Sequence, residues 1–145
     1  MNKTLTTTCL ALVIALSVRV AAQGTDNDKK VSEALSVLNY LGLPASRLAA
    51  FTLLAFVQIG AEQAWNEAQR KSLRLHDVLE WIAEQYGVRY AENTRESLRR
   101  DAINPMVQAG VLEHNPDSPG LAQNHPRNHY AVHPASMEKI RQFIA

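Results

Sequence analysis

The chain of 145 residues is long enough for one domain with one hydrophobic core. Its fifteen Lys and Arg side chains nearly balance fourteen Asp and Glu side chains, so any affinity for nucleic acid must come from local clusters of basic residues. The single cysteine, Cys9, excludes an intramolecular disulfide and a cysteine-based zinc site.

Residues 1–24 form a leader-like segment that differs from the rest of the chain. An apolar run at residues 10–18, after a lysine and before small residues at 20–22, is typical of a secretory signal peptide. Arg19 interrupts this pattern, and a mis-assigned start is the alternative. The run is too short to span a membrane. We expect a cytoplasmic protein, or an exported one if residues 1–22 are a genuine signal peptide, with no membrane contact in the mature form.

A polar linker is expected at residues 24–28, within an N-terminal helical segment that covers residues 25–44. Apolar residues recur there at helical spacing until Gly42-Leu43-Pro44 ends the helix. Ser46 is placed to cap a second helix, which is apolar on nearly all sides up to Ile59 and therefore belongs at the centre of the core. Residues 65–71 show no clear pattern and are expected to form a loop or a short helix.

Two further helices are predicted over residues 76–86 and 93–109, ended by Gly87 and Gly110. Asn93 followed by Glu96 is a capping-box pattern at the start of the second of them. On a regular helical wheel its core face carries Leu98, Ala102, Pro105, Met106 and Ala109. The opposite side carries Glu96, Ser97, Arg100, Ile103 and Asn104. Pro105 is expected to kink this helix.

Two short strands are predicted after Gly110, over residues 111–114 and 129–133, with fourteen mostly polar residues between them. A last helix begins at Pro134 and uses Met137, Ile140, Phe143 and Ile144. The short connection 88–92 joins two helices, as in a helix-turn-helix, and the strand pair adds a wing. The expected fold is mainly α with a small β-wing. It is a winged helix-turn-helix over residues 45–145 preceded by an extra N-terminal helix.

Three arginines, Arg95, Arg99 and Arg100, crowd the start of the fourth helix, where the helix dipole favours carboxylates. Their planar guanidinium groups suit the recognition of phosphate and guanine. A solvated helix with a Glu96–Arg100 pair explains the same residues equally well.

Four of the five histidines lie between residues 114 and 133. His129 and His133 share a predicted strand, which separates them by about 13 Å, so no metal site is expected. Polar wing contacts to phosphate or sugar, or plain surface exposure, explain the histidines better. Serine nucleophile motifs, glycine-rich phosphate loops and paired carboxylates at catalytic spacing are absent from the sequence, so no catalytic residue is expected.

The block Asn93–Arg100, with Val107–Val111 and Asn115–Pro119 behind it, resembles the N-terminal helix-turn-helix region of the BsuBI/PstI family of type II restriction endonucleases. The segments 34–44, 52–55 and 81–87 agree in the same order, and the resemblance covers about residues 28–145. In that family the wing closes with an Asn-Ser-Pro-Lys-like segment. This chain has Asn124-His125-Pro126-Arg127-Asn128 instead, and we expect Arg127 to take the place of the lysine.

The resemblance implies the DNA-binding recognition domain of an enzyme that cleaves double-stranded DNA at specific sites. The family's catalytic domain is of the PD-(D/E)xK type and holds Mg²⁺. Here Pro116-Asp117 has no downstream carboxylate-x-Lys partner, so we expect no nuclease activity from this chain alone. No cofactor is expected in it, and Mg²⁺ only with the absent catalytic domain.

The expected partners are double-stranded DNA and a separate or missing nuclease domain, and a homodimer stays open. The expected DNA contacts are Asn93, Thr94, Arg95, Ser97, Arg99, Arg100, Asn104 and Arg127. The alternative is a stand-alone winged-helix transcriptional regulator or a protein-interaction module whose basic face binds an acidic protein.

Overall fold

The computed structural model describes residues 24–122 and 125–143. The leader-like segment up to residue 23, with Cys9, lies outside the described residues, as do Asn124 of the wing and Ile144 of the last helix. After a helix over residues 24–40, the elements in chain order are α2 (Arg47–Val57), η1 (Trp65–Glu67), α3 (Leu75–Tyr86), α4 (Thr94–Leu98), η2 (Arg99–Ile103), α5 (Asn104–Gln108), β1 (Leu112–His114), β2 (Tyr130–Val132) and α6 (Pro134–Arg141).

The helix α2 forms the centre of the core, as predicted. The Ser46 side chain accepts a hydrogen bond from the backbone N–H of Ala49 at 3.1 Å and so caps its start. Every residue from Ala49 to Val57 is buried. This helix contacts α3, α4, η2 and β2, so the rest of the domain is assembled around an apolar cylinder.

The predicted linker over residues 24–28 is wrong, because these residues are already helical. The Asn27 side chain donates to the backbone carbonyl of Tyr86 at 3.3 Å, and a carboxylate oxygen of Asp28 lies 3.7 Å from the Arg47 guanidinium. These contacts hold a polar helical turn against α3 and α2. None of the helices in the described part of the chain has both the length and the apolar character needed to cross a bilayer.

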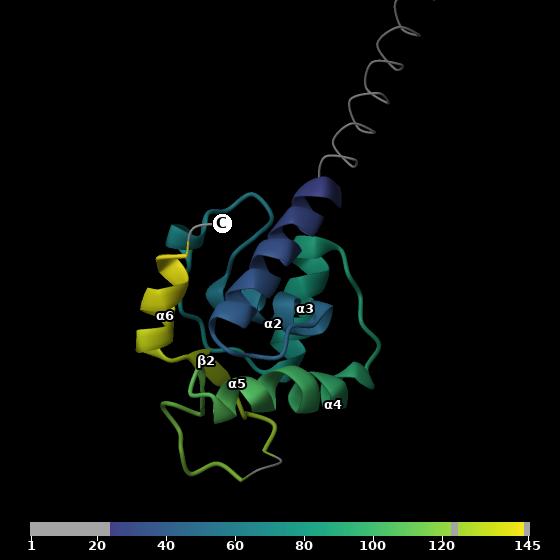
Figure 1. Ribbon diagram of the computed structural model, residues 1–145. Coiled ribbons are helices and arrows are strands. Elements are labelled where there is room, and N and C mark those ends of the chain that lie inside the picture. The colour runs from purple at the N-terminus through teal and green to yellow at the C-terminus, as the bar shows by residue number, and fades with distance from the viewer. Residues whose placement is uncertain (1–23, 123–124, 144–145) are drawn as a thin grey trace, which may run out of the picture.

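The segments α4, η2 and α5 form one continuous helix, which we call the arginine helix; in Figure 1 it runs across the lower part of the domain, above the loop of the wing. Its middle turn is widened, since the N–H of Asn104 bonds to the carbonyl of Arg99, five residues back. The widening directly precedes Pro105, which has no N–H to donate. The predicted irregularity is therefore a wide turn before the proline.

The wide turn changes which residues face the core. Ile103 is fully buried, although a regular wheel places it on the outer side with Arg100. The wide turn rotates Ile103 toward the side of Leu98. Ala109 is exposed, although the wheel places it on the core face, because α5 ends at Gln108.

The predicted capping box at Asn93 is also wrong. Asn93 has helical backbone angles, φ −67° and ψ −12°, and its side chain makes no capping hydrogen bond. The first N–H groups of the helix are satisfied by backbone carbonyls instead: Thr94 donates to Ala91 at 2.9 Å and Arg95 to Glu92 at 3.3 Å. A tight turn before the helix has replaced the side-chain cap.

The wing is built as predicted, as an antiparallel pair in which Leu112 faces Val132 and His114 faces Tyr130. A bridge with two backbone hydrogen bonds of 2.9 Å joins Tyr130 to Leu73, just before α3. Asn115, buried and at φ +48°, braces the loop by accepting from the N–H of His129 at 2.8 Å. The described chain is thus a winged helix-turn-helix preceded by an additional helix.

Candidate nucleic-acid interface

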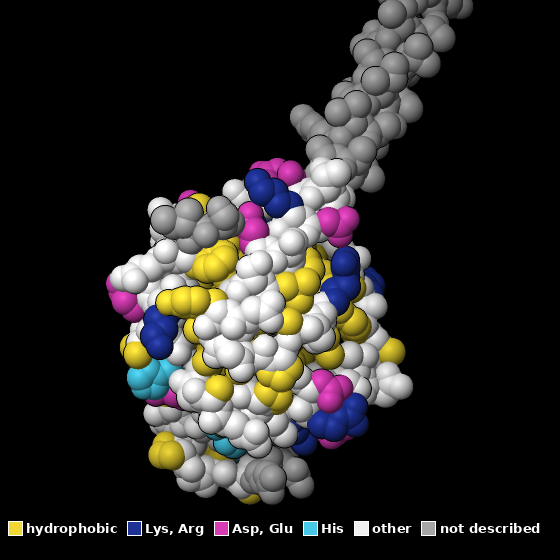
Figure 2. Space-filling model, viewed as in Figure 1, with side chains coloured by type: hydrophobic (Ala, Val, Ile, Leu, Met, Phe, Trp, Pro, Cys, Tyr) yellow, Lys and Arg dark blue, Asp and Glu magenta, His cyan; other side chains and the backbone are white. Residues whose placement is uncertain are grey.

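The outer face of the arginine helix is polar and open to solvent. Arg100 and Asn104 are exposed on it, and the Arg100 side chain keeps 73% of its accessible surface. Its Nε donates to Asp101 at 2.8 Å, and this hydrogen bond lowers the pKa of the Asp101 carboxyl. At the α4 end of the molecule, Figure 2 shows basic and acidic side chains lying next to one another.

Arg95 and Arg99 lie elsewhere, in a cleft of about 390 Å³ that Arg100 does not line. The three arginines, expected to act as one cluster, therefore belong to two surfaces. The cleft lies between the start of α3, the first half of the arginine helix and the wing. It is lined by Arg74, Leu75, His76, Arg95, Arg99, His125, Pro126, Asn128 and Tyr130.

Each of the three arginines has a carboxylate partner close in sequence. Arg95 lies 3.2 Å from Glu92, and Arg99 lies 3.4 Å from Glu96. The predicted alternative, a Glu96–Arg100 pair, is absent from the ion pairs of the described residues. The Glu92 and Glu96 side chains are 81% and 77% exposed, and ion pairs of this kind are worth about 0–1 kcal/mol. A phosphate group can therefore displace these carboxylates at small cost.

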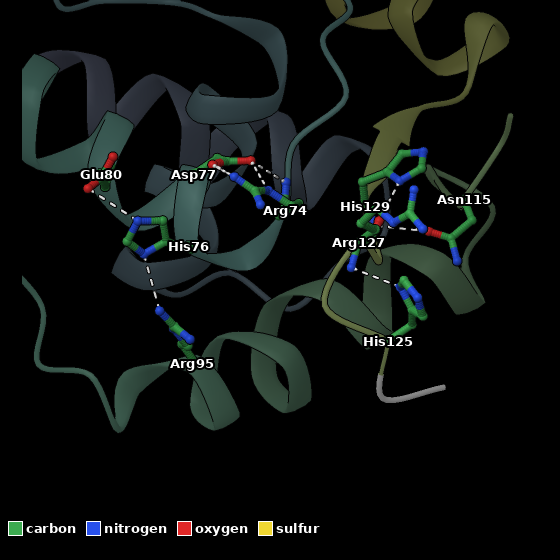
Figure 3. Close-up of polar contacts among 9 residues, drawn as sticks. All are labelled: Arg74, His76, Asp77, Glu80, Arg95, Asn115, His125, Arg127 and His129. Carbon is green, nitrogen blue, oxygen red and sulfur yellow. Dashed lines mark hydrogen bonds and ion pairs between the residues drawn. The ribbon is translucent and has the colours of Figure 1, made fainter. Parts of the chain in front are cut away.

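His76 connects the arginine helix to α3 (Figure 3). One nitrogen of the Arg95 guanidinium lies 3.2 Å from Nδ1 of His76, and Nε2 of His76 lies 3.2 Å from Glu80. A guanidinium only donates, so Nδ1 accepts and Nε2 carries the proton that bonds to Glu80. The Arg95 Nε atom is buried and has no hydrogen-bond partner among the described residues.

Arg74, at the start of α3, reaches the same cleft. Its guanidinium makes two hydrogen bonds of 3.0 Å to the carboxylate of Asp77, which also accepts from the Arg74 backbone N–H (Figure 3). The Arg74 guanidinium lowers the pKa of Asp77. Arg74 and His76 were not predicted from the sequence. A basic pair at the start of the helix before the arginine helix was the available signal.

Arg127 lies on the wing but outside this cleft. Its exposed side chain lines a neighbouring hollow that contains Asp117 and His129 and shares Arg74 with the cleft. Its backbone N–H donates to Nδ1 of His125 at 3.1 Å, and its carbonyl lies 2.9 Å from Nδ1 of His129. The other nitrogen of His129 contacts the Asp117 carboxylate. The Arg127 carbonyl, and then Asp117, raise the pKa of His129.

The remaining predicted contact residues occupy the start and flank of the arginine helix. Asn93 is exposed before its first turn, while Thr94 and Ser97 are half-buried. None of the three lines the cleft. Among the described residues, no group of three or more His, Cys, Asp and Glu side chains is arranged to hold a metal ion.

Comparison with known proteins places this geometry in a family. The family described as "BsuBI/PstI restriction endonuclease HTH domain" matches residues 28–144. The chain is 32% identical over 114 residues to the type II restriction enzyme BsuBI of Bacillus subtilis, covering 77% of this chain and 36% of that enzyme. It is 28% identical over 103 residues to the type II restriction enzyme AplI of Arthrospira platensis, covering 69% of this chain and 32% of that enzyme.

A solved structure shares the fold. The structure of SdaI restriction endonuclease superposes with a TM-score of 0.73 and 24% sequence identity over 76% of this chain and 35% of that one. The chain thus spans about a third of the length of each of these relatives. Because the family match covers most of the chain, this protein belongs to the BsuBI/PstI restriction endonuclease helix-turn-helix domain family.

Proposed function

We propose that this domain binds double-stranded DNA as the recognition domain of a type II restriction endonuclease. The observation that carries the proposal is the exposed outer face of the arginine helix, with Arg100 and Asn104 on it and the wing beside it. A helix held in this way by a preceding helix and a wing fits the major groove. The family membership supports the proposal, since the relatives BsuBI and AplI are named restriction enzymes.

The residues on this face divide by the chemistry that they offer. Arg100 suits bidentate hydrogen bonds to guanine, and Asn104 suits bidentate bonds to adenine. Asn93, Thr94 and Ser97, near the start of the helix, offer short polar groups for backbone contacts that fix its position. Arg127 would hold the wing on the neighbouring phosphates. In this proposal the outer face reads bases, and the surrounding residues position it.

We assign cleavage to a different part of the enzyme. The chain matches about a third of BsuBI and of AplI, so site-specific cutting of DNA and its Mg²⁺ requirement are attributed to a nuclease domain of the PD-(D/E)xK type. That domain is a proposed partner of this one. Pairing of two such domains in a homodimer would place two arginine helices in successive major grooves. A DNA partner implies a cytoplasmic protein.

Duplex binding with base selectivity tests the proposal. A target is first selected from a random duplex pool, and affinity for it is then measured by fluorescence anisotropy at several salt concentrations. Arg100→Gln is expected to weaken binding to the selected target by about 1–3 kcal/mol and to relax its base preference. Lys139→Gln on α6 removes one exposed positive charge outside this face and serves as the control. Absence of salt-dependent duplex binding, or unchanged selectivity in Arg100→Gln, contradicts the proposal.

A further inference from the structure

The cleft beside the arginine helix is lined by three arginines from two elements. Arg95 and Arg99 lie on the arginine helix and Arg74 lies at the start of α3, while His76 and His125 line the cleft with imidazole rings. None of the described residues that line the cleft is Asp or Glu. The partner carboxylates, such as Glu92, lie outside it. A concave surface of this composition suits an anion.

Three separate elements converge on the cleft, and the backbone holds them together. The Leu73–Tyr130 bridge fixes the start of α3 against the base of the wing. Arg74, which follows Leu73, is therefore held next to Tyr130. The His76–Arg95 contact at 3.2 Å joins α3 to the arginine helix. The basic groups are thus positioned before any ligand arrives, which reduces the entropy that binding costs.

Hydrogen-bonding capacity also remains on Arg95, one of the residues that line the cleft. The Arg95 Nε atom is buried and lacks a partner among the described residues, although a guanidinium has five N–H donors. Guanidinium groups bind phosphate oxygens in a bidentate manner, which makes them better suited to phosphate than to chloride or to an isolated carbonyl group. Phosphate oxygens are therefore the ligand chemistry that this arrangement favours.

We propose that the cleft holds one phosphodiester group of the DNA backbone, shared by Arg74, Arg95 and Arg99. This inference rests on the proposed DNA binding and adds a clamp beside the outer face that reads bases. Arg95 and Arg100 are five residues apart on one helix, which is about 7.5 Å along its axis. In this proposal a duplex on the outer face places its sugar-phosphate strand against Arg95 and Arg99. The clamp fixes the depth and rotation of the helix in the groove.

The number of phosphates that the arginines neutralise distinguishes a shared site from separate contacts. Binding of the full chain to the selected duplex is measured from about 50 to 300 mM salt for the wild type, Arg74→Gln, Arg95→Gln and the double variant. Each neutralised phosphate contributes about 0.9 to the slope of log affinity against log salt. We expect each single variant to bind more weakly. In the double variant the slope should fall by at most about 0.9. Its fold loss of affinity should be smaller than the product of the fold losses in the two single variants.

Several results overturn the clamp. A double variant that loses about 1.8 of slope with multiplicative affinity losses would show two independent phosphate contacts. Unchanged affinity in both single variants would show that the cleft does not touch DNA. A wild type without salt-dependent duplex binding would instead remove the proposed function itself, and so the two failures are distinguishable. Lys139→Gln is the charge-matched control, and thermal melting verifies that every variant is folded.

Two further measurements complete the test. Arg95→Lys keeps the charge but removes the planar fork, so an affinity between those of the wild type and Arg95→Gln is expected. If Arg95→Gln does not fold, Arg95→Lys takes its place in the double variant. Inorganic phosphate at constant ionic strength tests for a free anion as the occupant. If it raises the melting temperature of the wild type but not of Arg74→Gln, while Arg74→Gln binds duplex normally, the site takes free phosphate and the DNA clamp is wrong.

Discussion

Replacing Ile103 tests the wide turn on which the geometry of the arginine helix depends. Its side chain is fully buried, although a regular helix would direct it to solvent beside Arg100. Ile103→Val removes one buried methylene group and is expected to lower the free energy of unfolding by about 0.5–1.5 kcal/mol. Ile103→Ala removes more and is expected to cost about 2–5 kcal/mol, a large share of the roughly 5–15 kcal/mol that stabilises a typical domain.

Thermal and urea unfolding measure these changes. For a domain of this size, the valine variant should melt roughly 2–6 °C below the wild type. Gln108→Ala, at an exposed position of the same helix, is the control and should stay within about 0.5 kcal/mol of the wild type. If Ile103→Val and Ile103→Ala both behave like that control, Ile103 faces solvent and the wide turn is refuted.

The other predictions concern the wing, the core and the interface. The Arg127 carbonyl and then Asp117 raise the pKa of His129, so these two contacts stabilise the fold fully below the ordinary histidine value of 6.5, and this contribution is lost as pH rises through the raised value. The lowered pKa of Asp117 means that the contact between Asp117 and His129 is lost in acid below 3.8, as pH falls through the lowered value. The difference in melting temperature between the wild type and His129→Gln should therefore narrow toward both pH extremes, and a pH-independent difference would contradict this. Tyr86→Phe removes the 2.8 Å hydrogen bond from the buried hydroxyl to the carbonyl of Ile59 and should cost about 1–3 kcal/mol in urea unfolding, whereas a neutral result would mean that water replaces the hydroxyl. Glu96→Gln should tighten duplex binding up to about fivefold in an anisotropy titration, because the exposed carboxylate competes with phosphate for its arginine partner; weaker binding would show that the pair orients the arginine instead.

Apolar spacing predicted the helices and strands because it reflects which side of each element is buried. The second helix shows this most clearly, since its cap at Ser46 depends only on neighbouring residues and its apolar run from Ala49 to Val57 is buried throughout. The hairpin pairing followed from two alternating segments separated by a polar loop. Rules for helix caps, apolar spacing and hairpins were sufficient where contacts between neighbouring residues decide the structure.

Local rules failed where a distant or backbone partner intervened. Residues 24–28 have the composition of a linker, but Asn27 and Asp28 find partners on α3 and α2, which keep the turn helical. Asn93 has the right neighbours for a cap, but backbone carbonyls of the preceding turn satisfy the helix start first. The helical wheel assumes a uniform 100° per residue, and the turn before Pro105 does not obey it.

The candidate interface likewise has features that the sequence predicted and features that it did not. The outward position of Arg100 and Asn104 followed from the sequence, and their contact with DNA stays a prediction. The separation of Arg95 and Arg99 from Arg100 did not follow, because it depends on how α3 and the wing pack against the helix. Arg74 was missed since its proximity to these arginines arises only in the folded chain.

The bridge between Leu73 and Tyr130 limits what the wing loop must specify. Because this backbone bridge and the β1–β2 ladder set the base of the hairpin, the tip of the wing loop beyond Asn115 can change in composition without altering the spacing between the start of α3 and the base of the wing.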